Sequence, residues 1–347
     1  MSNAEPRHFC GCRQRIIQIH PTLRCNLACA HCYSDSGPEA TLTLDSALVC
    51  SALSDAASLG YGVVSFSGGE PLLYRGLDSA LAHGRSCGMR TTVTTNGTLL
   101  ARVPRFAGLI DLLAISLDGP QDLHNRVRAS DRAFDLLVCG LDDVRRAGVK
   151  FGFIHTLTRE SWEHLPWLAD FAVEQGAVLL QLHPLELAGR AGELMRGDRP
   201  EDDTLARAYL LATTLASKYE GRLTIQLDVF HTEHLLEYPE LAYAADLGPD
   251  LSIYRAADLL SPVVVEADAT VVPVCYGFSR DYAICNLKEE ALAAAWPRYL
   301  RERYPMFASL CRRVFKEATI PRDLPFLNWY ELILASSRAT AFAQAAL

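Results

Sequence analysis

The chain has 347 residues, of which 50% are hydrophobic and 21% are charged, so it can bury a sizeable core and is not globally disordered. Its net charge of −8 argues against nucleic acid as the main partner, because proteins that neutralise many phosphates are usually basic. The start has no apolar signal segment, and no stretch approaches the ~18 apolar residues that span a membrane. We therefore expect a cytoplasmic protein with neither nucleic acid nor a membrane as a partner.

The first two thirds of the chain alternate short β-rich runs with longer amphipathic runs, which is typical of βα units. Expected strands are Ile16–His20, Val63–Ser67, Arg90–Thr95, Asp111–Leu117, Phe151–Thr158 and Ala177–His183. Expected helices are Leu44–Leu59, Leu77–Cys87, Leu99–Ala107, Ala133–Ala147, Ser161–Gln175 and Glu201–Tyr219. Six such units predict an α/β fold with a parallel sheet.

The alternation stops after Gly221. The remaining residues predict a strand at Leu223–Val229, a hairpin at Val263–Val274, and helices near Leu287–Arg303 and Leu332–Ala346. We predict two parts: a βα part over residues 14–225 and a small α+β extension over residues 226–347.

Three of the eleven cysteines lie close together directly after the first expected strand: Cys25, Cys29 and Cys32. An odd number of cysteines in a reducing compartment argues against a disulfide framework. Three thiolates suit a [4Fe–4S] cluster with one iron left open. Structural zinc would need a fourth ligand, such as His31 or Cys10.

This cysteine spacing resembles the signature of the radical S-adenosylmethionine (radical SAM) superfamily, C-x3-C-x-(aromatic)-C, with His31 in the aromatic position. Further motifs of that family follow the second, third and fourth expected strands, at Ser67–Pro71, Thr95–Gly97 and Ser116–Asp118. The resemblance covers roughly residues 14–220 and implies a partial (β/α)6 TIM-like barrel with a small α+β C-terminal extension.

The resemblance also implies a binding site for SAM. Glu70 in the GGE motif would contact the amino group of SAM, and Ser116 would lie near its ribose or carboxylate. One arginine among Arg126, Arg128 and Arg132 could pair with the SAM carboxylate, and we expect Arg128. His183–Arg190 would line the adenosine pocket. The full set of expected cofactor-binding residues is Tyr33, Gly68, Gly69, Glu70, Pro71, Thr95, Asn96, Ser116, Asp118 and Arg128.

The chemistry implied by the resemblance is reductive cleavage of SAM at a [4Fe–4S] cluster on the catalytic Cys25, Cys29 and Cys32. The resulting 5′-deoxyadenosyl radical would abstract hydrogen from a substrate. An external donor such as flavodoxin or ferredoxin would supply the electron. The alternative from another class is a non-enzymatic iron–sulfur electron-transfer protein, which the open iron and the glycine motif argue against.

The last third holds Cys275, Cys285 and Cys311 in an arrangement that resembles a reduced SPASM or twitch extension. The full module uses seven cysteines for two clusters, so we expect at most one auxiliary cluster here, completed by Cys10, by Cys12 or by an open iron. Two other interpretations stay open. Cys275 or Cys285 could be a free thiol that returns hydrogen to a substrate radical, or all three could be ordinary semi-buried cysteines.

The branch resemblance favours a peptide substrate, as in ribosomal peptide modification or maturation. The second interpretation is a porphyrin or another small metabolite in cofactor biosynthesis. Because only about 15 residues precede the first expected strand, a peptide would need a separate recognition protein or a groove on the extension.

Overall fold

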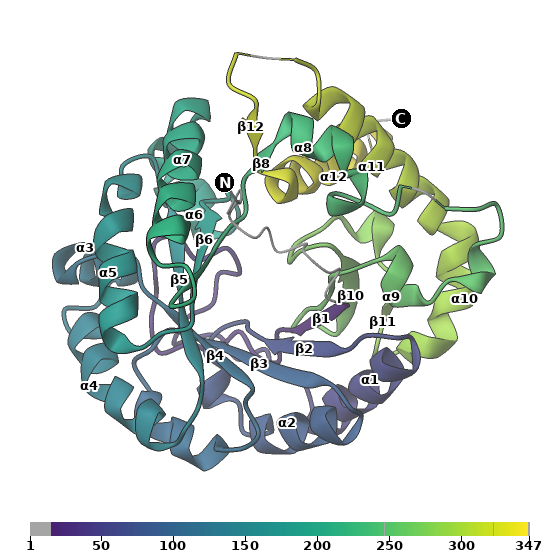
Figure 1. The fold of residues 1–347 in the computed structure, drawn as a ribbon. Helices are drawn as coiled ribbons and strands as arrows, with labels where there is room; N and C mark the ends of the chain where they lie inside the picture. Colours follow the sequence, from purple (N-terminus) through teal and green to yellow (C-terminus); the bar gives the residue numbers. More distant parts are fainter. Residues whose placement is uncertain (1–14, 246, 322, 346–347) are drawn as a thin grey trace.

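A computed structural model describes residues 15–245, 247–321 and 323–345, and within these residues ten strands form one curved sheet (Figure 1). The order of the strands is β11-β10-β9-β1-β2-β3-β4-β5-β6-β7. Neighbouring strands from β1 to β7 are parallel: β1 (Ile16–Ile19), β2 (Val63–Phe66), β3 (Arg90–Thr95), β4 (Leu112–Ser116), β5 (Phe151–Leu157), β6 (Leu179–Pro184) and β7 (Thr224–Leu227). The expected α/β barrel-like fold is therefore confirmed.

Figure 1 shows the helices of the βα units on the outside of the curved sheet. The longer ones are α1 (Ser46–Ser58), α2 (Leu77–Ser86), α4 (Ala133–Arg146), α5 (Leu165–Gln175) and α7 (Asp202–Lys218). Shorter helices are α3 (Gln121–Arg128) and α6 (Arg190–Leu194), with 3-10 turns at Pro71–Leu73, Leu100–Phe106, Ser161–His164 and Arg196–Asp198. Within the described residues, no helix combines the length and hydrophobicity that a membrane crossing requires.

The C-terminal extension joins the same sheet. Its strand β9 (Val263–Val265) pairs parallel with β1, and β10 (Thr270–Pro273) and β11 (Cys285–Asn286) continue the sheet antiparallel. A separate pair joins β8 (Phe230–His231) to β12 (Phe326–Leu327). The helices of the extension are α8 (Thr232–Glu237), α9 (Ala256–Leu259), α10 (Leu292–Glu302), α11 (Tyr304–Ala318) and α12 (Trp329–Ala345), and 3-10 turns lie at Pro239–Leu241, Leu251–Ile253 and Arg280–Tyr282.

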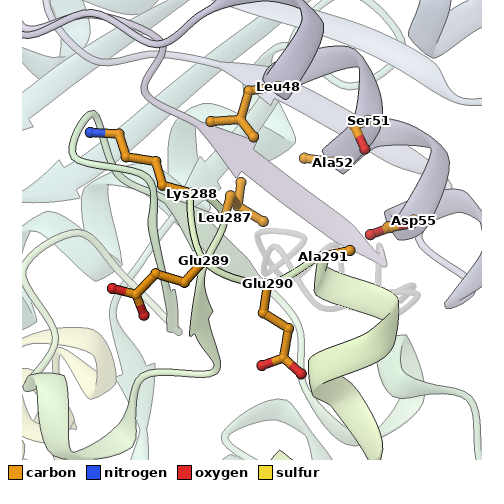
Figure 2. Close-up of a pocket in the computed structure, with 9 residues that line it drawn as sticks. All are labelled: Leu48, Ser51, Ala52, Asp55, Leu287, Lys288, Glu289, Glu290 and Ala291. Carbon is orange, nitrogen blue, oxygen red and sulfur yellow. The ribbon is translucent and has the colours of Figure 1, made fainter.

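The extension also packs against the outside of the barrel at α1. A hollow of about 150 Å³ lies between α1 and residues 287–291, lined by Leu48, Asp55 and Leu287 among others (Figure 2). Beside it, the N–H of Ala293 donates to the Asp55 carboxylate at 3.1 Å. The start expected for the helix at Leu287 is wrong, because residues 287–290 form a turn in which the N–H groups of Glu289 and Glu290 donate to the carbonyl of Asn286, and α10 begins at Leu292.

Helix α3 was not expected from the sequence, and one expected helix has a tighter form. The segment expected to be a helix over residues 99–107 forms a 3-10 turn at Leu100–Phe106 that contains Pro104, which cannot donate an α-helical hydrogen bond. Helix α3 has no apolar stripe, because its buried positions are His124 and Arg128. Helix α11 is the helical segment that was expected to carry Cys311, and Pro305 in its first turn is the signal that marks its start.

Candidate active site

The cysteine loop follows β1 at the carboxyl end of the parallel strands, where ligands of such sheets bind. Cys25 and Cys29 are buried together with Leu27, and Cys32 packs against them. All cysteines among the described residues are free thiols, as expected for a site that holds metal rather than a disulfide.

The GGE motif supports the backbone of this loop. The N–H of Gly69 donates to the carbonyl of Thr22 at 2.8 Å, and the N–H of Glu70 donates to that of Arg24 at 2.9 Å. Gly68 has a φ of +109°, and a Cβ there would lie 2.7 Å from the carbonyl oxygen of Thr22. The two glycines therefore allow two backbone segments to touch, which holds the start of the cysteine loop against the end of β2.

Glu70 is fully buried, and both of its carboxylate oxygens accept hydrogen bonds from the protein. One oxygen accepts from the N–H of Leu72 at 3.0 Å and from the hydroxyl of Thr95 at 2.9 Å, and the other accepts from the N–H of Asn96 at 2.8 Å. Burial raises the pKa of this carboxyl, and the hydrogen bonds oppose that rise. Glu70 thus ties the end of β2 to the end of β3, and contact with SAM stays a prediction.

Replacing Glu70 by alanine is expected to destabilise the protein as well as to weaken SAM binding. Each buried donor left without an acceptor costs about 1–3 kcal/mol. Chemical denaturation measures this loss, with Glu39→Ala at an exposed position as the control. If Glu70→Ala is as stable as the wild type and only its SAM binding is weaker, the role of Glu70 is to bind the ligand and not to stabilise the fold.

Asn96 brings the end of β3 to the first cysteine. Its side-chain N–H₂ lies 3.6 Å from the Cys25 sulfur and donates to the Asn26 amide oxygen at 3.0 Å. Its own amide oxygen accepts from the N–H and the hydroxyl of Thr98, at 3.0 and 2.6 Å. The amide orientation is therefore fixed with its donor toward the sulfur.

Asp118, which follows β4, is the centre of a buried charge network at the second cysteine. Its carboxylate accepts from Arg128 Nε at 2.7 Å and lies 3.3 Å from His31 Nε2. Arg128 also directs one Nη toward the Cys29 sulfur at 3.9 Å. Since Asp118 and Arg128 are both less than 10% exposed, the pair carries charge into the interior beside Cys29.

The pKa values in this network follow its geometry. Burial works against the charged form of Asp118, but the neighbouring Arg128 and His31 outweigh burial and hold the pKa of that carboxyl well below its usual range. Burial lowers the pKa of His124 to about 4, so the His124 ring is neutral and its Nδ1 accepts from the N–H of Asp118. The helix α3 that sequence reasoning missed thus delivers both His124 and Arg128 to the site.

The donor set fits an iron–sulfur cluster. Burial raises the pKa of Cys25 to about 11 and also raises that of Cys29, so these thiols keep their protons unless a metal ion binds them. Asn96 and Arg128 supply N–H groups to the sulfurs, and such bonds tune cluster potentials. Among the described residues, no group of three or more His, Cys, Asp or Glu side chains stands in metal-binding geometry.

The remaining expected cofactor residues lie around the same end of the sheet. The Tyr33 hydroxyl is 3.3 Å from that of Ser67, and the Tyr33 ring meets His20 edge-on at 5.9 Å. Pro71 opens the 3-10 turn that Glu70 caps, and Ser116 ends β4 with a half-buried side chain. A direct role of each toward SAM stays a prediction.

Residues 19–172 match the Radical SAM superfamily. The chain contains a radical SAM domain. Fe-coproporphyrin III synthase of Methanosarcina barkeri is similar to it, with 30% identity over 191 residues, which are 54% of this chain and 48% of that protein. The chain spans about half the length of the curated relatives it matches.

Solved radical SAM enzymes of the SPASM/twitch type share the fold. SuiB of Streptococcus suis bound to S-adenosylmethionine superposes with a TM-score of 0.66 at 20% identity, over 85% of this chain and 68% of SuiB. AnSMEcpe with bound AdoMet and Kp18Cys peptide superposes with a TM-score of 0.64 at 17% identity, over 95% of this chain and 97% of that chain. The likeness thus extends beyond the radical SAM domain into the C-terminal extension.

The three C-terminal cysteines lie in three different environments. Cys275 follows β10 and is influenced by Glu186 and Arg338, Cys285 opens β11 near Glu290 and Arg298, and Cys311 is buried within α11. Cys285 lines a separate hollow of about 770 Å³ beside α10. Cys10 and Cys12, the other suggested ligands, lie outside the described residues. One auxiliary cluster on these cysteines therefore stays a prediction.

Iron content tests the auxiliary cluster. If it exists, the wild type will bind roughly twice the iron of the Cys275→Ala/Cys285→Ala/Cys311→Ala protein, because each cube holds four irons. Equal iron content in the wild type and in the triple variant would contradict the auxiliary cluster, and the different surroundings of the three thiols make this outcome important to test. Equal iron combined with intact SAM cleavage would leave the free-thiol and semi-buried interpretations.

His183 and two acids, Glu186 and Asp228, form a further group of coupled side chains at the ends of β6 and β7, and sequence reasoning did not single out Asp228. His183 at the end of β6 pairs through Nδ1 with Asp228, which follows β7 and has one buried oxygen without a hydrogen-bond partner. The charge of Asp228 outweighs burial and raises the pKa of His183. Burial raises the pKa of Glu186 to about 7. An acid directly after a β-rich run, as at Asp228, was the available signal.

Proposed function

We propose that this chain is a radical SAM enzyme that acts on a peptide. SAM would be cleaved reductively at a [4Fe–4S] cluster on Cys25, Cys29 and Cys32, and the 5′-deoxyadenosyl radical would abstract hydrogen from the substrate. The observation that carries the proposal is the cysteine loop itself, held at the carboxyl ends of the strands with N–H groups of Asn96 and Arg128 directed at two of its sulfurs. The match to the Radical SAM superfamily supports the [4Fe–4S] cluster and SAM as the cofactors.

The protein residues orient and enclose the reaction. Cys25, Cys29 and Cys32 would hold the cluster, which when bound would supply the electron for the cleavage of SAM. The Gly68–Glu70 segment and Asn96 fix the loop at Cys25, and the Asp118–Arg128 pair fixes it at Cys29. A flavodoxin or a ferredoxin would deliver the electron.

The acidic character of Glu186 supports a peptide as the substrate. Burial raises the pKa of its carboxyl to about 7, and the charges of Glu331 and Asp228 add to the rise while those of His183 and Arg338 oppose it. A carboxylate accepts the N–H groups that a peptide offers, whereas it repels the carboxylates of a substrate that carries several of them.

Glu186 is well placed for this role. Burial, and to a smaller degree the charge of Glu186, raises the pKa of Tyr33 beside the cluster loop and that of Cys275 in the extension. The charges of His183 and Arg338 in turn lower the pKa of Glu186, against the larger effect of burial. Glu186 is thus coupled electrostatically to the cysteine loop and to the extension, and we infer that a substrate binds beside it.

A tetrapyrrole is the second candidate, because the sequence similarity to Fe-coproporphyrin III synthase favours it. The two candidates differ in charge. A tetrapyrrole with carboxylate side chains would be repelled by Glu186 when that group is ionised, so its turnover would fall as the pH rises through about 7. A peptide held by an ionised Glu186 would show the opposite trend.

Formation of 5′-deoxyadenosine tests the proposal. The anaerobically reconstituted protein with SAM and dithionite is expected to make 5′-deoxyadenosine, and a reduced protein that leaves SAM intact would support the electron-transfer alternative. Two kinds of deuterated probe then compare the substrate classes: a tetrapyrrole with carboxylate side chains and, where a short peptide is encoded beside the gene, that peptide. The true class will carry deuterium from its own C–D bond into 5′-deoxyadenosine, and transfer from the tetrapyrrole would overturn the peptide proposal.

A further inference from the structure

Arg190, in the segment after β6, binds the backbone of the cysteine loop at three points. Its Nε donates to the carbonyl of Cys29 at 2.9 Å, and one Nη donates to that of Ser36 at 2.7 Å. Its backbone N–H donates to the carbonyl of Cys32 at 3.0 Å. One residue thus spans the loop from the second cysteine to a point beyond the third.

Gly189, the residue before Arg190, also lies directly against the backbone of the cysteine loop. Gly189 has a φ of +53°, and a Cβ there would lie 2.6 Å from the carbonyl oxygens of both Cys32 and Tyr33. No side chain can be accommodated at that distance from two backbone oxygens. Gly189 and Arg190 therefore act together, the first by allowing the approach and the second by binding the loop.

Arg190 and Arg128 differ in whether a carboxylate neutralises their charge. Arg128 is neutralised by Asp118, with which it forms two hydrogen bonds. Within the part of the chain that the structure describes, Arg190 donates to carbonyl oxygens and pairs with no carboxylate. Its positive charge is therefore not cancelled by the protein, and it lies on the backbone carbonyls of Cys29 and Ser36.

We infer that Arg190 is a positioning residue for the iron–sulfur cluster, which sets the conformation of the Cys29–Ser36 segment and adds an uncompensated positive charge beside the cluster. The inference rests on the proposed function, because it requires a cluster on Cys25, Cys29 and Cys32. A cluster on three thiolates gains negative charge when it is reduced, so a nearby cation favours the reduced form. The shape of the arginine matters separately, since its planar fork reaches two carbonyls that a lysine ammonium reaches less well.

Two substitutions separate charge from shape. Arg190→Gln removes the charge, Arg190→Lys keeps it without the fork, and Arg196→Gln changes an exposed arginine six residues further on as the control. Each protein is reconstituted anaerobically. Iron per chain, the EPR spectrum of the reduced cluster with and without SAM, and the midpoint potential are then measured.

We expect the midpoint potential of Arg190→Gln to move to more negative values, while that of Arg190→Lys stays near the wild type. Both should show an altered EPR spectrum and a smaller change on SAM addition, because the loop is no longer fixed. Arg196→Gln should match the wild type in all three measurements. A purely structural role would lower iron content equally in both Arg190 variants without moving the potential of the remaining cluster.

The outcomes separate this inference from the proposed function. A wild type that binds no [4Fe–4S] cluster would overturn the proposed function. A wild type with a normal cluster and an Arg190→Gln protein with the same potential and EPR spectrum would overturn the inference alone. If Arg190→Gln fails to fold, by circular dichroism, the Arg190→Lys spectrum decides, and an unchanged spectrum overturns the role in loop positioning.

Discussion

Alanine in place of Cys25, Cys29 or Cys32 is expected to abolish SAM cleavage. A cube held by two protein ligands loses its geometry and its open iron position. The 5′-deoxyadenosine yield of each reconstituted variant should fall to the level without protein, and the visible absorbance of the cluster should disappear with it. The loss should be complete rather than partial, because no other cysteine among the described residues lies in this small buried group.

Cys139→Ala is the matched control, since Cys139 is an exposed free thiol on α4. It should keep both the iron content and the activity of the wild type. Native rates of 5′-deoxyadenosine formation in Cys29→Ala would disprove the assignment of the cluster ligands. Loss of activity in Cys139→Ala as well would show that reconstitution, rather than ligation, limits the assay.

Replacing Asp118 by asparagine is expected to lower the free energy of unfolding by about 3–5 kcal/mol at neutral pH, because it leaves Arg128 as a buried, unpaired cation. Chemical denaturation of the cluster-free protein measures the difference. The control is Asp142→Asn, which breaks an exposed pair with Arg145 and should cost less than about 1 kcal/mol.

The pH dependence of this difference has a definite sign. The pKa of Asp118 is well below its usual range in the folded protein, so its contribution to stability is present above the unfolded pKa of about 3.9. It is lost as the pH falls through the folded value. The gap between wild type and Asp118→Asn should therefore be constant from about pH 5 to 8 and shrink in acid, and a gap that grows in acid would contradict the ion pair.

The six strands of the βα units could be predicted from the sequence because each is a short run rich in apolar or β-branched residues and is bounded by turn residues, as in the apolar β4 and the threonine-rich β3. The cysteine loop and the GGE motif could be found because each is compact in sequence. The residues that support them could not. Arg190 binds Cys29 across 161 residues of sequence, and no local pattern marks such a contact.

The role of Glu70 shows a different limit. A carboxylate after two glycines suggested a ligand for an ammonium group, but its donors include the backbone N–H groups of Leu72 and Asn96. Every residue except proline has a backbone N–H, so the amino-acid sequence does not show which of them bind Glu70. The motif therefore suggested an ammonium ligand for Glu70 and not its hydrogen bonds to the backbone. Helix α3 was hidden for a related reason, since it buries a histidine and an arginine rather than an apolar stripe.

The pairing of β9 with β1 protects the strand that leads into the cysteine loop. Without the extension, β1 would have a free side, and unpaired strand edges invite association with other chains. Instead, Ile17 pairs with Val64 on one side and with Val263 on the other, and the N–H of His20 donates to the carbonyl of Val265. The free edge moves out to β11, which is two residues long. The extension therefore protects the barrel from self-association at the strand that leads into the cysteine loop.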